Sequence, residues 1–287
     1  MTSTQSSGEG VRAFYASEIQ AVANLKSDRL VAALARIPRE RFLGPGPWQV
    51  YAGDVGMGGG TYYTTPDADP ARVYHNVVVA LDASRLLNNG LPSLGAAWIE
   101  ALAIRPGARI AHIGCATGYF TALIAEVSAP LGSVTAFEID DGLAARAKEN
   151  LAPWQHVSVE RDGTALSGQY DAILVSAGVT HPLPNWLDAL KPGGRLLVPL
   201  TTDMGGGTIG KGWMLKIEQT ERHFAARFGG IVAIYHCTGA RSAAMVPLLQ
   251  KAFTSWGFAE VKRLRRDQHL ADSGCWLHAD TWCLSKQ

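Results

Sequence analysis

The chain has 287 residues, of which 47% are hydrophobic and 18% are charged, and its formal net charge is +1 at pH 7. This length and composition are typical of a globular protein with a substantial buried interior. The near-neutral charge argues against a general attraction to nucleic acid or to anionic membranes, so neither is expected as a partner. The sequence gives no indication of oligomeric state.

Residues 1–10, MTSTQSSGEG, are small and polar and are expected to form a disordered N-terminus. They lack the apolar segment of a signal peptide, and no apolar run in the chain approaches the roughly 20 residues that span a bilayer. A cytoplasmic location is therefore expected. Two helices are predicted next, over residues 11–24 and 28–37, from apolar positions at helical spacing.

A long loop is predicted over residues 44–70, because this stretch is rich in glycine and proline. Its segment 56–63, GMGGGTYY, combines backbone freedom with the rings of Tyr62 and Tyr63. Loops of this length are usually functional or disordered, so Tyr62 and Tyr63 are candidate contacts to a substrate under a mobile lid. The alternative is an ordinary surface loop without a role in substrate binding.

A strand is predicted over residues 74–82, followed by a loop with Asn88, Asn89 and Gly90 and by a helix that Ser93 caps. Strands and helices are then predicted to alternate through the centre of the fold. The predicted strands are 110–113, 134–138, 156–160, 170–178 and 195–200, and the predicted helices are 119–127, 141–151 and 186–194. This alternation predicts five parallel strands.

The last third reads as antiparallel strands at 212–219 and 223–237, a helix at 243–256 and a final strand at 280–285. Together these elements predict an α/β, Rossmann-like, mostly parallel seven-stranded sheet with helices on both faces, an N-terminal helical and loop addition, and a β-rich C-terminal extension. The expected parts are 11–92 with the helices and lid, 93–200 as the nucleotide-binding core, and 201–287 completing the sheet.

The four cysteines contain no CxxC pair, so reduced thiols are expected. His269, Cys275, His278 and Cys283 gather in the tail and offer four potential metal ligands. Single Cys and His residues more often lie satisfied in a core, and no metal is predicted.

The stretch 108–140 has the order strand, glycine turn, helix, strand and acidic residue. Gly114 and Gly118 flank the turn, where a missing Cβ permits positive φ and the close approach of a ligand. Glu138 follows Gly114 by twenty-four residues, near the place where this architecture holds an acid against a ribose diol. This pattern predicts a nucleotide-like ligand, although GCATGY lacks the glycine spacing of a nicotinamide dehydrogenase.

The GCATG turn, Glu138, Asp162-Gly163 and the strand before LKPGGRLLVPL together resemble the S-adenosylmethionine-dependent methyltransferases with a Rossmann-like core. More narrowly, LARIPRERFL, the turn RDG and LVSAGVTHPLPNWLDALKPGGRLLVPL are similar to the protein-L-isoaspartate O-methyltransferases. The resemblance covers about residues 28–200.

The resemblance implies S-adenosyl-L-methionine as cofactor, with the glycine turn at its methionine part, Glu138 at its ribose and Asp162-Gly163 at its adenine. The residues assigned to this site are His112, Gly114, Cys115, Ala116, Gly118, Tyr119, Glu138, Ile139, Asp162, Gly163 and Ser176. Acids at the carboxyl ends of parallel strands fit this placement, since ligands bind at that edge of a sheet. A helix cap and a simple turn are the alternative readings of Glu138 and Asp162.

Three positions depart from the family pattern. His112 stands where an acid is usual, Ala116 replaces the middle glycine of the turn, and Gly90 occupies the position of a serine that touches the substrate carboxyl. A neutral imidazole at 112 can hydrogen-bond the donor or lie satisfied in the core. Asn88, Asn89 and Ser93 keep polar groups near the expected acceptor, so isoaspartyl peptides themselves are expected to be poor substrates.

Methylation of a carboxylate needs no general base, which fits the lack of a clear nucleophile–base pair. The leading prediction is therefore O-methylation of a carboxylate on a peptide or small metabolite, with Asn89 and Ser93 beside the reacting group. A small-molecule N- or O-methyltransferase would use His181 as its base, unless that residue is only a loop histidine. A catalytically silent S-adenosylmethionine-binding or scaffold protein is the prediction from another class.

Overall fold

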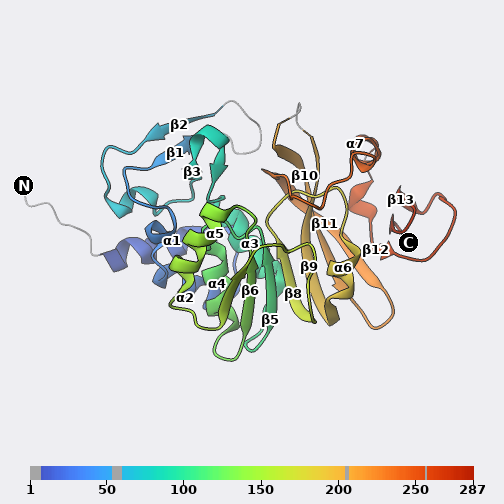
Figure 1. Cartoon of the computed structure of the whole chain (residues 1–287), viewed down its shortest axis with the longest axis horizontal. Coiled ribbons are helices and arrows are strands. Elements are labelled where there is room, and N and C mark those ends of the chain that lie inside the picture. Colours follow the sequence, from blue (N-terminus) through green and yellow to red (C-terminus); the bar gives the residue numbers. More distant parts are fainter. Residues whose placement is uncertain (1–7, 54–59, 204–206, 256) are drawn as a thin grey trace, which may run out of the picture. The chain divides into compact units, whose positions relative to one another are not determined.

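The computed structural model describes residues 8–53, 60–203, 207–255 and 257–287 (Figure 1). The chain forms two compact units, the first made of residues 1–108 and 115–161, the second of residues 109–114 and 162–287. No helix in the described part is long and apolar enough to cross a membrane.

The first unit opens with two helices, as predicted: α1 (Gly8–Ala23) and α2 (Asp28–Arg36). Helix α1 therefore includes the last three residues of the segment expected to be disordered; residues 1–7 lie outside the described part. The Ser27 hydroxyl accepts the Leu30 N–H at 3.3 Å and caps α2. Tyr15 and Ile19 from α1, with Leu30 and Leu34 from α2, are fully buried, so the apolar stripes predicted from sequence form part of the core.

The prediction of a loop without regular structure over residues 44–70 is wrong. Strands β1 (Gln49–Ala52) and β2 (Thr61–Thr64) pair antiparallel there, with Tyr51 opposite Tyr62 and their ring centroids 5.4 Å apart. Val50 of β1 is buried in a cluster with Leu43, Trp48, Val73 and Val79. Apolar anchors spaced among the glycines and prolines therefore organise this segment.

A second hairpin, β3 (Ala80–Asp82) with β4 (Leu87–Asn88), precedes helix α3 (Pro92–Leu102). Ser93 does not cap this helix, because the helix starts one residue earlier and Leu91 occupies its N-cap. Pro92 is well suited to the first helical position, where its missing N–H leaves no bond unmade.

The remainder of the first unit is α4 (Tyr119–Ser128), β6 (Ser133–Phe137), α5 (Asp141–Leu151) and β7 (Val157–Glu160). Strands β6 and β7 are parallel, with Val134 opposite Val157. The Asp140 carboxylate accepts the Leu143 N–H at 3.0 Å and caps α5. These elements match the predicted strand–helix alternation.

In the second unit, β5 (Arg109–Ile113), β8 (Tyr170–Val175) and β9 (Leu190–Asp203) are joined by two parallel ladders. The helix expected over 186–194 is wrong in extent: α6 covers only Pro184–Asp188. Pro192 cannot donate a helical hydrogen bond, and the segment from Leu190 instead pairs with β8 across a register shift between Tyr170 and Ala172.

The expected C-terminal antiparallel strands and helix are present as β10 (Ile209–Gln219), β11 (Phe224–Tyr235) and α7 (Met245–Thr254). Strands β9, β10 and β11 lie side by side (Figure 1). Beyond them lie the short strands β12 (Arg263–Arg265), β13 (Cys275–His278) and β14 (Cys283–Ser285). An aromatic cluster supports this part, formed by Trp213, Phe228, Phe253, Phe258 and Trp276.

The strands of the main sheet follow the order β13-β14-β12-β11-β10-β9-β8-β5-β6-β7. The prediction of a mostly parallel, seven-stranded sheet therefore has to be corrected to a mixed sheet of ten strands. The difference arises after residue 203, where the ladders that join β10, β11, β12, β14 and β13 are antiparallel. Strands β12 and β13 are only three and four residues long, so their period-2 signal is too brief to read from sequence.

Candidate cofactor and acceptor sites

In the first unit, the turn before α4 depends on left-handed backbone. Gly118, at the N-cap of α4, has φ +96°, and Ala116 has φ +50°. A Cβ at position 118 would lie 2.8 Å from Leu151 Cδ1, so only glycine fits there without a shift. Thr117 Oγ1 donates to the Phe42 carbonyl at 2.7 Å, which fastens the turn to the N-terminal region.

Glu138 immediately follows β6 and is held by backbone on both sides. Its Oε2 accepts the Ala116 N–H at 2.8 Å and its Oε1 accepts the Asp140 N–H at 3.1 Å. Burial raises the pKa of Glu138, and the two backbone donors oppose that rise. The carboxylate thus bridges the turn and the start of α5 and keeps further lone pairs for other donors.

Cys115 and Ile139, two further predicted cofactor residues, lie next to these groups in the chain. The Cys115 N–H donates to the Phe137 carbonyl at 3.0 Å, which ties the turn to the end of β6. Burial, followed by the charge of Glu138, raises the pKa of the Cys115 thiol, so this cysteine is not an activated nucleophile. Ile139 is 49% exposed and leaves an apolar side chain at the surface beside Glu138.

Tyr119 is buried in the first unit rather than open to a ligand. Its hydroxyl lies 3.0 Å from that of Tyr15, and its ring packs edge-on against Phe42 with a centroid separation of 5.6 Å. Burial raises the pKa of Tyr119 and keeps the phenol neutral. Its side chain therefore has a packing role, and only its backbone remains a candidate for cofactor contact.

The predicted acceptor residues form one short segment after β4. Asn88 Oδ1 accepts the Gly90 N–H at 2.9 Å, and Gly90 has φ +79°. A Cβ at position 90 would lie 3.0 Å from Phe120 Cε2. The backbone here therefore disfavours any residue with a side chain, including the serine of the family pattern.

Asn89 and Ser93 are both buried, at 6% and 8% exposure. The Ser93 N–H donates to Asn76 Oδ1 at 3.0 Å. Asn89 Oδ1 is buried and has no hydrogen-bond partner among the described residues. A buried amide oxygen without a donor costs free energy, so it marks a place where a bound molecule can supply one.

Two contacts place this segment beside the glycine turn and Glu138. Arg85, which starts the connection to β4, pairs with Asp140 at 3.0 Å, two residues after Glu138. Gly90 packs against Phe120, in the first turn of α4. Neither Arg85 nor Phe120 was predicted from the sequence as a site residue. Asp140, two residues after Glu138, was the only local sign that an arginine would pair there.

The β1–β2 hairpin borders the same segment through Val78 and Val79. The Tyr51 N–H donates to the Val78 carbonyl at 2.9 Å, and the Asn89 N–H donates to the Val79 carbonyl at 2.9 Å. Tyr63 of β2 is about half exposed. The direction of Tyr62 and Tyr63 toward an acceptor stays a prediction.

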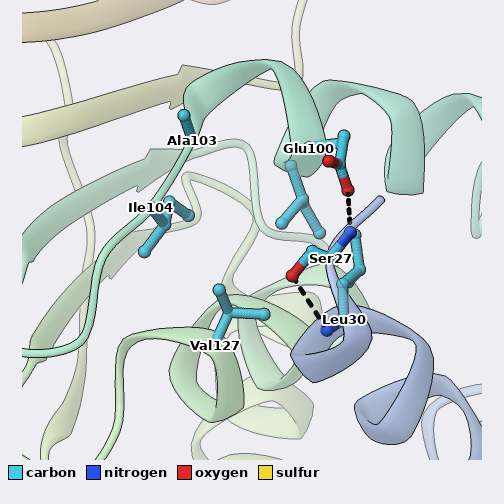
Figure 2. Close-up of a pocket in the computed structure, with 7 residues that line it drawn as sticks. Ser27, Leu30, Glu100, Ala103, Ile104 and Val127 are labelled. Atoms are coloured by element: carbon cyan, nitrogen blue, oxygen red, sulfur yellow. Dashed lines mark hydrogen bonds between the residues drawn. The ribbon is translucent and has the colours of Figure 1, made fainter. Parts of the chain in front are cut away.

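Two of the hollows that the described residues form lie in the first unit. The larger, about 800 Å³, is lined by residues that include Trp48, Asp82 and Arg146 and borders the β3 segment that leads to Asn88. The smaller, about 80 Å³, lies between α2, α3 and α4 (Figure 2). Its polar groups pair with each other, because the Ser27 N–H donates to Glu100 at 3.2 Å, and it includes none of the predicted site residues.

In the second unit, two predicted cofactor residues contact each other. His112 Nε2 lies 3.0 Å from Ser176 Oγ. Burial lowers the pKa of His112 to about 3, so the imidazole is neutral at physiological pH. Gly114 has φ +77°, and a Cβ there would lie 3.2 Å from the Ser176 carbonyl oxygen. This geometry agrees with the interpretation of His112 as a buried, hydrogen-bonded core residue. It also explains why position 114 is a glycine, since a side chain there would crowd Ser176.

Asp162 and Gly163 form a tight turn in the same unit. Asp162 Oδ1 accepts both the Thr164 N–H at 2.8 Å and the Thr164 hydroxyl at 2.7 Å. These bonds lower the pKa of Asp162 and keep it ionised. The Gly163 carbonyl accepts the buried Trp186 indole N–H at 2.7 Å. The turn is thus fixed without Asp162 Oδ2, which leaves that atom for a further donor.

His181, the predicted general base, follows β8. Its Nδ1 lies 2.9 Å from Thr180 Oγ1, and the same hydroxyl accepts the Ser242 N–H at 2.9 Å. Burial lowers the pKa of His181, which favours the neutral imidazole. Because Nδ1 is engaged by Thr180, only Nε2 can serve an acceptor.

The family model of the protein-L-isoaspartate (D-aspartate) O-methyltransferases matches residues 16–207, two thirds of the chain. The chain belongs to this family. Its members are S-adenosylmethionine-dependent methyltransferases, so the resemblance, the reaction class and the cofactor predicted from the sequence are confirmed. The match ends near the close of β9, so β10 to β14 lie beyond it.

Among similar proteins, the protein-L-isoaspartate O-methyltransferase of Thermotoga maritima is 27% identical over 185 residues, which cover 61% of this chain and 51% of that protein. That of Methanopyrus kandleri is 25% identical over 63% of this chain and 73% of its own length. This chain therefore spans about half the length of the Thermotoga relative.

Two solved structures share the fold. A protein-L-isoaspartate O-methyltransferase aligns with a TM-score of 0.60 at 21% identity, over 85% of this chain and 69% of its own. A Plasmodium falciparum protein described as a putative member, in complex with S-adenosyl-L-homocysteine, aligns with a TM-score of 0.59 at 14% identity, over 78% and 97%. At these identities the likeness supports the methyltransferase fold.

Proposed function

We propose that this chain transfers the methyl group of S-adenosylmethionine to a carboxylate oxygen of a peptide or a small metabolite. Family membership supports the class of reaction, and the observation that carries the cofactor assignment is the position of Glu138 between the Ala116 and Asp140 amides. A buried carboxylate held in this way is preorganised for two ribose hydroxyl donors.

The proposal assigns the remaining cofactor contacts to each unit separately. In the first unit, Ile139 supplies an apolar surface beside Glu138, and the turn from Cys115 to Gly118 faces the methionine part. In the second, Asp162 Oδ2 accepts a hydrogen bond from the adenine amine, while His112 and Ser176 form a neutral support for Gly114. Each assignment makes its own prediction for donor binding.

When bound, the cofactor supplies an electrophilic methyl group on a sulfonium. That methyl group would pass to an acceptor carboxylate oxygen, with the C–S bond exchanged for a C–O bond and the released sulfur left neutral. The protein contributes position and exclusion of water rather than proton transfer, since a carboxylate is already a nucleophile. The high pKa of the Cys115 thiol and the neutral His112 fit a site without covalent catalysis.

We propose that Asn89 holds the acceptor. Its buried Oδ1 needs a donor, which a peptide N–H or a metabolite hydroxyl supplies. In the same segment, Gly90 packs against the first turn of α4 and Arg85 pairs with Asp140, two residues after Glu138, which supports an acceptor position close to the donor. Asn89→Ala is expected to raise KM for the acceptor several-fold while donor affinity stays unchanged.

Isoaspartyl peptides are expected to be poor substrates. The family pattern has a serine at position 90, but φ +79° and the nearby Phe120 ring disfavour a side chain there. For the same reason Gly90→Ser is expected to destabilise the protein rather than restore the activity. Vigorous turnover of an isoaspartyl peptide by the natural protein would contradict this expectation.

The decisive experiment is a screen of carboxylate acceptors, peptides and small acids, with S-adenosylmethionine labelled in its methyl group. Base-labile methyl incorporation is expected, because methyl esters hydrolyse in mild alkali. Label that survives alkali would instead indicate N- or phenol O-methylation. Donor binding by calorimetry with no incorporation into any acceptor would favour the silent scaffold.

A second candidate function, methylation of an amine or phenol, is favoured by one observation. The neutral His181 keeps Nε2 available for a proton while Thr180 orients the ring. His181→Asn would then abolish alkali-stable methylation, whereas carboxylate methylation would retain most of its rate.

We also propose that the glycine-containing segment 53–66 of the first unit closes over the acceptor. Gly56, Gly58 and Gly59 of this segment lie outside the described residues. Limited proteolysis tests the proposal: cleavage in this segment is expected to slow when donor and acceptor are present together. An unchanged cleavage rate would make the segment an ordinary linker.

A further inference from the structure

Four metal-ligand side chains converge near the C-terminus of the second unit. The ligand atoms of His269, Cys275, His278 and Cys283 all lie within 4.8 Å of one another. Cys283 is buried and the other three are half-buried. None of the four belongs to the proposed cofactor or acceptor site, and the segment lies beyond the part of the chain that the family model matches.

Strand pairing explains how three of these residues share one face. His278 lies directly opposite Cys283 on β14, and Cys275 lies opposite Ser285, two residues further along the same strand. Residues two apart on a strand point to the same face, so all three side chains do as well. Cys275 and His278 are three apart and would otherwise face opposite sides; the register shift between Cys275 and Leu277 compensates for the odd spacing.

The fourth residue, His269, comes from the segment before β13 and is held in one tautomer. Its Nδ1 lies 3.0 Å from the Asp267 carbonyl oxygen, which can only accept, so Nδ1 carries the proton. Nε2 therefore presents its lone pair, and it lies 3.4 Å from Cys275 Sγ. A ligand histidine whose other nitrogen donates to a carbonyl is the usual second-sphere arrangement at a metal.

Two separations between the ligand atoms already match the edges of a tetrahedron around one ion, and all four atoms lie within 4.8 Å of one another. Sulfur and nitrogen ligands about 2.0–2.3 Å from a central zinc lie roughly 3.3–3.8 Å from each other. Cys275 Sγ lies 3.4 Å from His269 Nε2 and 3.7 Å from His278 Nδ1. The rings of His269 and His278 are close, with centroids 4.7 Å apart and nearly perpendicular planes, so both can direct a nitrogen at one point.

We propose that His269, Cys275, His278 and Cys283 bind one Zn²⁺ as a closed, tetrahedral, structural site. Two thiolates and two imidazoles balance the charge of a divalent ion and are the ligand set that favours zinc over magnesium or calcium. With all four positions filled by protein, the ion has no open position for substrate. The earlier expectation of no metal rested on isolated residues, whereas the fold brings them together.

The ion would stabilise the edge of the sheet. Strands β13 and β14 have only four and three residues, so their ladder alone provides few hydrogen bonds. A zinc ion held by residues from both strands and from the preceding loop ties all three segments together, and binding free energy of this kind adds directly to folding.

The test uses the full chain purified under reducing conditions from cells grown with added zinc. Elemental mass spectrometry is expected to find about one zinc per chain, which is the stoichiometry of one four-ligand site. Cobalt added to the metal-depleted protein should give the visible d–d bands of a tetrahedral site and a sulfur-to-cobalt charge-transfer band. Cobalt without the sulfur band, or zinc far below stoichiometric amounts, would overturn the proposal.

Variants locate the site. Cys275→Ser and His278→Ala are each expected to lower zinc content at least tenfold, while the controls Cys237→Ser and His223→Gln, outside the cluster, keep it. Equal zinc loss in the controls would refute the assignment. If the cluster variants fail to fold, the cobalt spectrum of the natural chain still decides, and a Cys275–Cys283 disulfide in zinc-grown protein isolated without reductant would overturn the proposal directly.

Discussion

The glycine turn with Glu138 and the C-terminal cluster are two candidate ligand sites built in opposite ways. The first is made mainly of backbone: Ala116 and Asp140 give their amides to one carboxylate, and Gly118 supplies a conformation. The second is made of side chains, gathered by a strand irregularity. A site built from backbone therefore leaves a contiguous motif in the sequence, whereas the other leaves only scattered residues.

The difference also sets which changes matter. A backbone site should be broken by adding a Cβ where none fits, while loss of a side chain there costs one interaction. A site built from side chains should lose its ligand when any one of its four residues is replaced. At the glycine turn, substitutions that add a Cβ should therefore have larger effects than those that remove a side chain.

The largest effect is expected from Gly118→Ala. Its φ of +96° is strained for alanine, and the new Cβ would lie 2.8 Å from Leu151 Cδ1. Strain and overpacking together should lower the free energy of unfolding by about 2–4 kcal/mol. Chemical denaturation measures this change. Gly107→Ala is the matched control, because it has φ +84° but its Cβ would lie 3.9 Å from the nearest atom.

Gly107→Ala should therefore show the backbone cost alone, about 1 kcal/mol. Equal destabilisation by the two variants would mean that contact with Leu151 is unimportant and that the turn relaxes easily. The idea of a backbone-built site would then be wrong.

Glu138→Ala comes next. It removes a charged acceptor and leaves the Ala116 and Asp140 amides without their partner. Donor binding should weaken by about 1–3 kcal/mol, measured by calorimetry with S-adenosyl-L-homocysteine. Glu160→Ala, at the end of the neighbouring strand β7, is the control and should bind normally. Unchanged affinity in Glu138→Ala would contradict the ribose assignment.

The contrast explains what could be predicted from sequence. Glu138 and the glycine turn were found because their partners lie within thirty residues, and the helices 11–24 and 141–151 were found because their apolar spacing is regular. The hairpin at 49–64 was missed because single anchors such as Val50 and Trp48 carry it. Its register comes from contacts with Val73 and Val79, which a local pattern does not contain.

In the second unit, too, local sequence patterns fail where contacts between distant segments decide the structure. Strand β9 passes through Lys191–Gly194, where sequence rules for proline and glycine predict the end of a helix, because pairing with β8 outweighs local preference. The four proposed zinc ligands were recognised in the sequence as potential ligands, but a common site was not predicted. Spacing alone does not reveal the register shift between Cys275 and Leu277. Likewise, the φ of Gly90 is invisible in sequence.

A smaller effect is expected from pH. Burial raises the pKa of Glu138, so it takes up a proton at a higher pH than an exposed glutamate does. The ionised form is the one expected to bind the ribose, and donor affinity should therefore fall as pH falls through the raised pKa. For stability the sign is opposite: a raised folded-state pKa means that the contribution of Glu138 declines as pH rises through that range.

Calorimetry of donor binding over mildly acidic pH measures the effect, with Glu138→Gln as the reference. The natural protein should lose affinity, approaching about tenfold per pH unit well below the pKa, while the glutamine variant binds weakly and changes little. A parallel loss in both proteins would assign the pH dependence to another group.

The smallest effect is expected from Asp162→Asn. Asparagine can keep the turn, because its Oδ1 still accepts the Thr164 N–H and hydroxyl, but its amide donates where the carboxylate Oδ2 would accept from adenine. Asp162 is exposed, so the loss should be only about 1 kcal/mol, or roughly fivefold in donor Kd. Asp188→Asn, which removes another exposed carboxylate in the same unit, one paired with Arg266, should leave donor binding unchanged. If Asp162→Asn binds the donor as tightly as Asp188→Asn does, its carboxylate is only a turn element, and the adenine must be recognised through backbone, which would extend the backbone-built character of the site to its whole length.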